Sequence, residues 1–139
     1  MEAAVRGACA GSAESGLDTP DVLAVTVLTS MDADALAETG VTASAASQVD
    51  VLGQLALQAG VQGIVCSPNE ATAMRELLGT ERLVVTPGVR PSWTTSDDQA
   101  RVATPTSALE AGASHLVIGR PITAASSPIA ALERIVEEG

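Results

Sequence analysis

The residues best suited to chemistry follow two short apolar segments in the second half of the chain. Arg90 comes after the segment 83–86, in the motif TPGVRP, and Arg120 comes directly after Gly119 and the segment 115–118. An arginine can donate two parallel hydrogen bonds to an oxyanion, and the N–H of a glycine can approach one closely because no side chain intervenes. A phosphomonoester carries about −1.5 to −2 charges at pH 7. These residues therefore predict a phosphate-binding site.

The long polar loop after the segment 83–86 adds an amide donor to this site. Gln99 lies in that loop, nine positions after Arg90. Each of these residues also has a structural interpretation, which the residues alone leave open. Arg90 could pair with the acidic residues at 97–98, Gln99 is typical of a solvated loop, and Gly119 is typical of a turn.

The composition excludes several classes of function. The net charge of −10 repels nucleic acid and anionic membranes, so neither is expected as a partner. All basic residues are arginine, which removes Schiff-base formation and lysine proton donation from this chain. Two cysteines and one histidine disfavour a metal site. The chain has no apolar run of about 20 residues and no signal-peptide pattern, so we expect a soluble, cytoplasmic protein.

Four apolar runs alternate with helical segments in what is expected to be one domain, residues 1–139. Strands are predicted at 22–28, 63–66, 83–86 and 115–118. Helices are predicted at 32–38, 47–59, 69–78, 105–111 and 128–137. Within residues 1–20, the first nine predict part of a helix and 10–20 predict a mobile loop.

This alternation predicts an α/β fold with a parallel sheet and right-handed crossovers. The continuous apolar run 22–28 predicts a strand that is buried on both faces. Two architectures fit: an open doubly wound sheet, or a barrel of eight strands of which four units make half. In both, the working groups lie at the carboxyl ends of the strands. In a barrel, the loops after the last two strands frequently form a phosphate site, and here those loops carry Arg90 and Arg120.

Three other residues invite a functional assignment, but the sequence favours structural roles. His115 precedes an apolar run and should lie at the amino end of its strand, away from the site. Cys66 ends an apolar run, which is typical of a small buried thiol. Trp93 lies in the long loop, where it either anchors the loop or forms part of a lid.

Five motifs in order resemble orotidine 5′-phosphate decarboxylase of the bacterial type. They are VLAVTVLTSMD, GIVCSPNE, VVTPGVRP, DDQARVATP and HLVIGRPIT, and the match runs from near Met1 to near Glu137. The resemblance implies a TIM (β/α)8 barrel that decarboxylates orotidine 5′-phosphate to UMP, the last step of de novo pyrimidine synthesis. It also implies a homodimer that uses no cofactor.

The resemblance assigns substrate-binding roles to individual residues. Thr29 would contact the pyrimidine end of the ligand, and Pro87 would lie beside the base. The other ligand-binding positions would be Arg90, Gln99, Gly119 and Arg120. The last three would group at the phosphate, and the loop 91–99 would close over the substrate.

The chain departs from the family in one large respect. The catalytic motif Asp-x-Lys-x-x-Asp is absent, and the chain contains no lysine that could replace it. The match corresponds to the C-terminal half of the barrel, its last four βα units, so this chain is expected to be inactive alone. A truncated gene, a partial assembly and a deliberate half-barrel all remain open.

Three other functions stay open beside this interpretation. One is a non-catalytic module that binds phosphate or a nucleotide. Another is a folding-defective fragment, because a half-barrel leaves two edge strands unpaired. The last is a different phosphate-binding barrel, such as a ribulose-phosphate enzyme.

Overall fold

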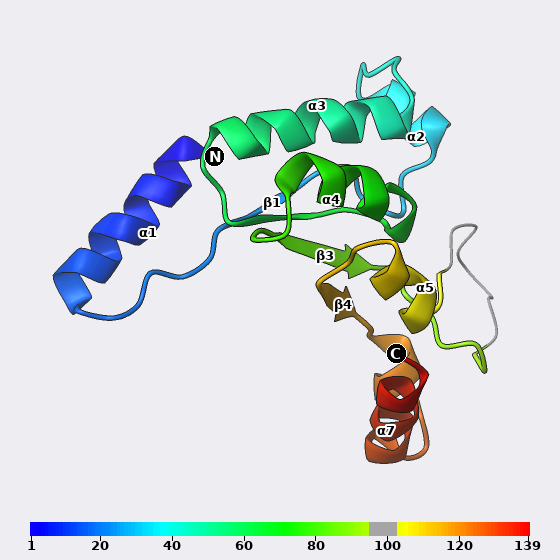
Figure 1. Ribbon diagram of the computed structural model, residues 1–139. Coiled ribbons are helices and arrows are strands. Elements are labelled where there is room, and N and C mark those ends of the chain that lie inside the picture. The colour runs from blue at the N-terminus through cyan, green and yellow to red at the C-terminus, as the bar shows by residue number, and fades with distance from the viewer. Residues whose placement is uncertain (95–102) are drawn as a thin grey trace.

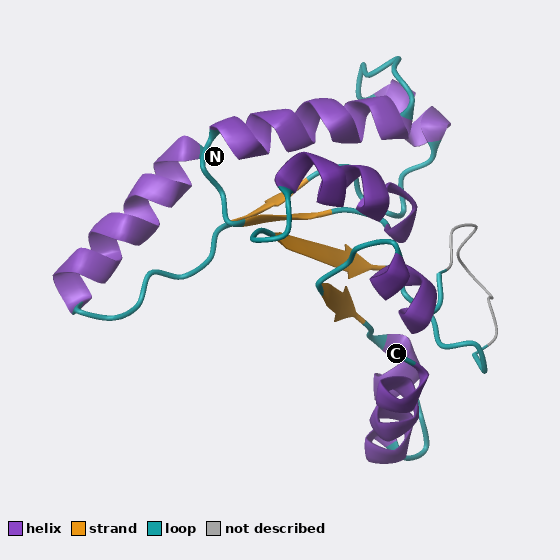
Figure 2. Cartoon of the chain, in the orientation of Figure 1, coloured by secondary structure: helices purple, strands orange, loops and turns teal. Residues whose placement is uncertain are grey.

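The computed structural model describes residues 1–94 and 103–139. Its centre is one parallel sheet in which the strands follow one another in chain order, β1-β2-β3-β4 (Figure 1, Figure 2). The strands are β1 (Leu23–Val25), β2 (Gly63–Val65), β3 (Leu83–Pro87) and β4 (His115–Val117). The helices are α1 (Glu2–Ser15), α2 (Ala33–Glu38), α3 (Ala45–Gln58), α4 (Ala71–Leu78), α5 (Pro105–Glu110), α6 (Arg120–Thr123) and α7 (Pro128–Glu138), with the 3-10 turn η1 (Pro68–Glu70).

Short polar side chains begin most of the predicted helices. Ser44 accepts a hydrogen bond from the N–H of Ser47 at the start of α3, and Thr104 does the same for Ser107 at the start of α5, each at 3.2 Å. Such caps satisfy N–H groups that have no partner inside the helix. Ser127 caps α7, where its hydroxyl accepts the N–H of Ala130.

The strand order decides between the two architectures that the sequence left open, a doubly wound sheet and part of a barrel. A doubly wound sheet reverses its strand order part-way, which places helices on both faces. Here the order never reverses, so every right-handed crossover lies on the same face. This is the arrangement of part of a barrel.

The main hydrophobic core lies between the sheet and helices α3 and α4. Ala24, Ile64 and Val84 are aligned across β1, β2 and β3 and are at most 8% exposed. Paired residues of parallel strands point to the same face, so this row faces the helices. Val49 of α3 and Met74 of α4 complete the core from the other side.

On the opposite face of the sheet, apolar side chains of the two outer strands stay exposed among the described residues. Leu23 and Val25 of β1 are 38% and 57% exposed, and Val117 of β4 is 51% exposed. The prediction of a strand over 22–28 buried on both faces was therefore wrong in both respects. The strand is three residues long, and as an edge strand it has a helix layer on one face only.

Helix α1 runs further than the sequence predicted. The loop expected over 10–20 begins at Gly16, because Ala10, Ala13 and Glu14 continue the helix. Gly16 ends it with φ at 70°, a left-handed conformation that glycine adopts readily. Residues 1–20 are thus mostly helix.

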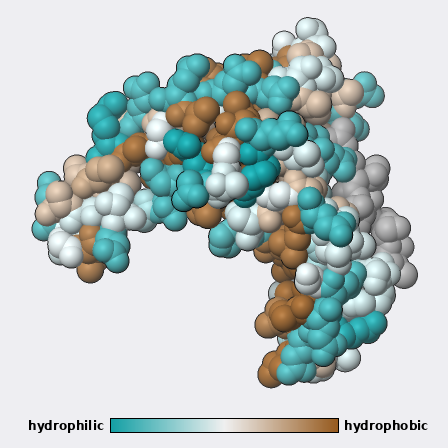
Figure 3. Space-filling model, in the orientation of Figure 1, coloured by the Kyte–Doolittle hydropathy of each residue, from teal (hydrophilic) through white to brown (hydrophobic). Residues whose placement is uncertain are grey.

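The last helix, α7, presents an apolar face to solvent. Ile129, Leu132 and Val136 are 73%, 49% and 71% exposed, and their spacing of three and four residues places them on one side of the helix. Hydrophobic side chains gather along the left side of the lower arm in Figure 3, where α7 lies. Among the described residues, no helix is long and apolar enough to cross a membrane.

Cys66 is buried in the main core, as predicted, and this gives the stability a defined pH dependence. Burial, together with the nearby charge of Glu70, raises the pKa of its thiol from 9.0 to about 12. Between these values the unfolded chain loses the thiol proton while the folded chain keeps it. The free energy of unfolding should therefore fall as pH rises above 9, by at most about 1.4 kcal/mol per pH unit.

Urea unfolding at several pH values above 8 measures this slope. The chain has no tyrosine and no lysine, so few other side chains titrate in this range. Cys66→Ala should lower the stability near pH 7 but flatten the alkaline slope, whereas Cys9→Ala, in exposed α1, should keep it. An unchanged slope in Cys66→Ala would contradict the assignment.

Candidate functional site

The carboxyl ends of all four strands lie along one edge of the sheet. In chain order, this edge carries Thr29 after β1, Ser67 after β2, Pro87 and Arg90 at β3, and Gly119 and Arg120 after β4. Because neighbouring parallel strands are about 4.8 Å apart, the ends of β3 and β4 are adjacent and that of β1 is roughly 10 Å from β3. The fold thus arranges the described candidate residues in one row.

Arg90 and Arg120 follow the carboxyl ends of adjacent strands at the same sequence spacing. Pro87 of β3 pairs with Val117 of β4, and each arginine follows its paired residue by three positions. The two segments that carry the arginines therefore leave the sheet from the same level.

A sharp turn directs the backbone from β3 to Arg90. Gly88 has φ at 79°, a conformation that costs other residues energy. Val89 follows it into a small second core with Ala108 and Ala113, where it is 2% exposed. The N–H of Arg90 then donates to the carbonyl oxygen of Ala103 at 2.9 Å. The backbone of Arg90 is thus held by the burial of Val89 before it and by its own hydrogen bond to Ala103. Its side chain stays partly exposed.

Gly119 leaves open space at the end of β4. A methyl group built on it would meet no atom of residues 1–94 or 103–139 within 4 Å. Its carbonyl oxygen accepts hydrogen bonds from the N–H groups of Ile122 and Thr123, at 2.9 and 3.1 Å. These bonds begin α6, which the sequence did not predict. Because α6 has only four residues, its dipole adds little positive charge at this corner.

The ends of β1 and β2 carry hydroxyl groups. Thr29 lies in a turn that Met31 closes by donating its N–H to the carbonyl oxygen of Leu28 at 3.0 Å. Ser67 is 2% exposed, and its hydroxyl donates to the carboxylate of Glu70. The sequence identified both hydroxyls but not Glu70 as the partner, although the spacing Ser-x-x-Glu is a local signal of a helix start.

Gln99 and the acidic pair 97–98 lie outside the described residues, so the role of Gln99 stays a prediction.

His115 lies at the amino end of β4, as expected, and its Nδ1 is 3.1 Å from the hydroxyl of Ser114. Among residues 1–94 and 103–139, no group of three His, Cys, Asp or Glu side chains could hold a metal ion.

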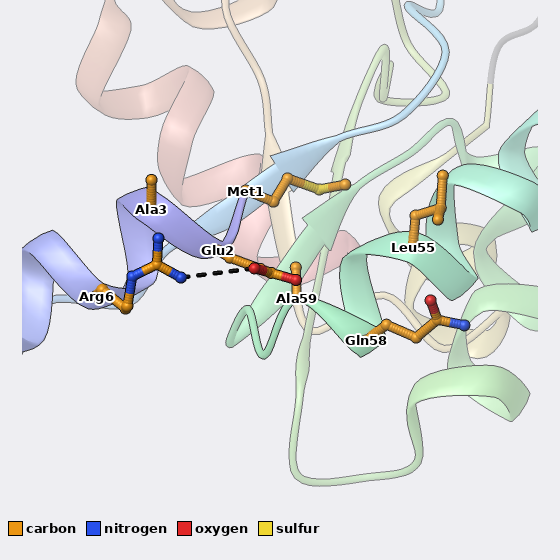
Figure 4. Close-up of a pocket in the computed structure, with 7 residues that line it drawn as sticks. All are labelled: Met1, Glu2, Ala3, Arg6, Leu55, Gln58 and Ala59. Atoms are coloured by element: carbon orange, nitrogen blue, oxygen red, sulfur yellow. Dashed lines mark ion pairs between the residues drawn. The ribbon is translucent and has the colours of Figure 1, made fainter.

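A cavity of about 390 Å³ lies at the end of the sheet where the strands begin. Figure 4 shows Glu2 and Arg6 of α1 on one side, joined by an ion pair of 3.5 Å, and Leu55 and Gln58 of α3 on the other. Helix α3 ends there and leads into the amino end of β2. The cavity is therefore remote from the carboxyl ends of the strands and is not part of the candidate site.

The long loop after β3 contacts α7, which sequence reasoning did not find. The N–H of Ser92 donates to Oε1 of Glu138 at 2.8 Å. The guanidinium of Arg134 lies 4.3 Å from the centre of the Trp93 ring. Of the two roles open to Trp93, this contact favours the anchor. Partners more than forty positions away in sequence leave no local signal.

Comparison with known proteins assigns the fold and the family. The family model described as orotidine 5′-phosphate decarboxylase / HUMPS family matches residues 1–135. The chain belongs to this family. The predicted fold, part of a TIM barrel, is also confirmed: the chain is similar to a crystal structure of orotidine 5′-phosphate decarboxylase from Lactobacillus acidophilus, with a TM-score of 0.81 and 41% identity over 99% of this chain and 56% of that one.

Two curated relatives are more similar in sequence. An orotidine 5′-phosphate decarboxylase of Heliobacterium modesticaldum is 50% identical over 139 residues, 99% of this chain and 57% of that protein. One of Caulobacter sp. is 54% identical over 132 residues, 94% of this chain and 57% of that protein. The chain spans about half the length of the curated relatives it matches.

Gly88 gives a test of how the backbone positions Arg90. Gly88→Ala should lower the free energy of unfolding by about 1–2 kcal/mol, because alanine disfavours a positive φ. Gly60→Ala is the matched control, since Gly60 has φ at 76° with open space around it and lies at the other edge of the sheet.

Both variants should lose similar stability in urea unfolding, but only Gly88→Ala should shift the amide NMR signal of Arg90. Equal shifts of that signal in both variants would show that Gly88 has no specific effect on Arg90.

Proposed function

We propose that this chain supplies the phosphate- and nucleotide-binding part of an orotidine 5′-phosphate decarboxylase. The observation that supports the proposal is that Arg90 and Arg120 each follow, by three positions, one of two paired residues at the carboxyl ends of β3 and β4, within the region that matches the family model. In the whole protein, the substrate would be orotidine 5′-phosphate and the product UMP. The homodimer expected from the family belongs to the same proposal.

The phosphate of the substrate fits the corner formed by β3 and β4. Arg90 and Arg120 would donate to its oxygens, the backbone at Gly119 would approach it through open space, and Gln99 would add an amide donor. These local charges matter because the chain as a whole carries −10. A dianion is repelled by the surface in general and attracted only where arginines are concentrated.

The remainder of the nucleotide would extend along the row of strand ends toward β1. Pro87 ends β3 on the open face of the sheet, in the position to border the base. Thr29, beyond β1, would contact the pyrimidine end. The separation of β1 from the arginine-bearing strands, roughly 10–14 Å from the strand spacing, leaves room for the sugar between them.

Catalysis would need a group that this chain does not supply. The family's Asp-x-Lys-x-x-Asp motif is absent, and no lysine occurs anywhere in the chain. The phosphate site would contribute binding energy remote from the bond that breaks, which can support a reaction at the base. The lysine and its flanking acids would come from the other half of the barrel.

A non-catalytic nucleotide-binding module is the alternative that a specific observation favours. The described binding positions are present, whereas the proton donor is absent. Such a module would bind UMP and would catalyse nothing when joined to the missing half.

Calorimetry with UMP tests the binding site. Arg120→Ala should weaken the affinity by about 10–100-fold, because a hydrogen bond to a charged group contributes about 1.5–3 kcal/mol. Arg6→Ala is the matched control, since Arg6 forms only an exposed ion pair with Glu2 at the other edge of the sheet. Equal affinities of the Arg120→Ala and Arg6→Ala variants for UMP would refute the phosphate site.

A decarboxylation assay separates binding from catalysis. The 139-residue chain alone should convert no orotidine 5′-phosphate above the uncatalysed rate, because it has no lysine. Mixing it with a separately expressed segment that carries the first four βα units and the Asp-x-Lys-x-x-Asp motif of a relative should restore turnover. Turnover by this chain alone would show that the lysine is dispensable, and no turnover of a stable mixture would favour the non-catalytic module.

A further inference from the structure

The segment that carries Arg90 is fixed to the protein at two successive places. The first is the end of β3, where Val89 forms a parallel bridge to Ala103 and the N–H of Arg90 donates to the same residue. The second is a tight turn. There Thr94 donates both its N–H, at 3.0 Å, and its hydroxyl, at 2.9 Å, to the carbonyl oxygen of the fully buried Pro91.

Helix α7 contacts this turn through two charged side chains. Glu138 accepts the N–H of Ser92 at 2.8 Å, and Arg134 stacks on the ring of Trp93 at 4.3 Å. Arg134 and Glu138 are four positions apart, so they lie on the same side of the helix. We call these four residues the loop–α7 junction. A hydrogen bond to a carboxylate and a cation over an indole ring are both stronger than the corresponding neutral contacts.

The junction is tied to the rest of the fold by the backbone. The carbonyl oxygen of Glu138 accepts the hydroxyl of Thr106, in the first turn of α5. Helix α5 follows directly from Ala103 and Thr104, the strand-like stretch that holds Arg90. The end of α7 therefore contacts both the turn that directly follows Arg90 and the first turn of α5, which follows the residue that accepts the N–H of Arg90.

Two complementary polar atoms at the junction are buried without a partner among the described residues. They are the indole Nε1 of Trp93, a donor, and Oε2 of Glu138, an acceptor. Their neighbours Ser92 and Arg134 already join the same two segments. The junction thus has capacity for one more hydrogen bond between the loop and α7.

We propose that the end of α7 positions Arg90: Glu138 and Arg134 hold Ser92 and Trp93, and thereby hold the backbone of Arg90 two residues earlier. Arg134 and Glu138 are positioning residues, since neither lies on the row of strand ends. The ligand of Arg90 rests on the proposed function, whereas the mechanical coupling between α7 and Arg90 does not. The two can therefore fail separately.

Amide hydrogen exchange by NMR on the full 139-residue chain tests the coupling without a ligand. In Glu138→Ala, the amides of Ser92 and Arg90 should each exchange about tenfold faster, while those of β2 stay unchanged. Glu137→Ala, an exposed carboxylate one position earlier, is the matched control and should change neither. Faster exchange at Ser92 without any change at Arg90 would overturn the proposal, and so would a uniform increase that includes β2.

Tryptophan fluorescence gives an independent measurement, because Trp93 is the only tryptophan in the chain. Arg134→Met should shift the emission to longer wavelength and increase quenching by acrylamide, and Arg134→Lys should restore part of both because it keeps the cation. Identical spectra for wild type and Arg134→Met would show that the stacking does not hold the ring.

UMP affinity connects the junction to the site. Glu138→Ala should weaken UMP binding about tenfold by calorimetry, and Glu137→Ala should not. Unchanged affinity in Glu138→Ala, beside faster exchange at Arg90, would overturn the positioning role while the phosphate site stands. If the wild-type chain binds no UMP, the proposed function fails, and the exchange experiment still decides the coupling.

Discussion

The rest of the structure depends on one constraint: the four strands pair in parallel, each with the next strand in the chain. Because no strand reverses the order, all crossovers lie on one face, and the main core forms only there. The same pairing places every strand end at one edge, where the segments that carry Arg90 and Arg120 leave adjacent strands. It also leaves β1 and β4 as edge strands and their outer apolar side chains exposed.

The exposed face and the site are two consequences of the same geometry. In a closed barrel, the interior face of each strand is filled by the strands across from it. Four strands provide half of that wall, so Val25 and Val117 have no opposite neighbours among the described residues. The residues that bind a phosphate in our proposal need only the adjacent β3 and β4. In the same proposal, the part of the site that contacts the nucleobase would need the opposite wall as well.

Local sequence was sufficient for the elements whose signals are local. The caps Ser127 and Thr104, the prolines that follow them and the left-handed Gly112 mark helix boundaries through contacts within a few residues. Two predictions failed for different reasons. The loop expected from Ala10 is helical because Ala10, Ala13 and Glu14 favour a helix, so a local signal was given too little weight. The four-residue α6 was not expected, because so short a helix has no periodic pattern.

The sequence by itself determined the alternation of strands and helices, the family, and the identity of the candidate binding residues, because these follow from residue types and short spacings. Tertiary structure decided the strand order, the exposed face of β1, and the contacts of Ser92 and Trp93 with α7. Those contacts join residues about forty positions apart or more. Their energies come from packing and hydrogen bonds that exist only once the sheet has brought the segments together, so no local pattern encodes them.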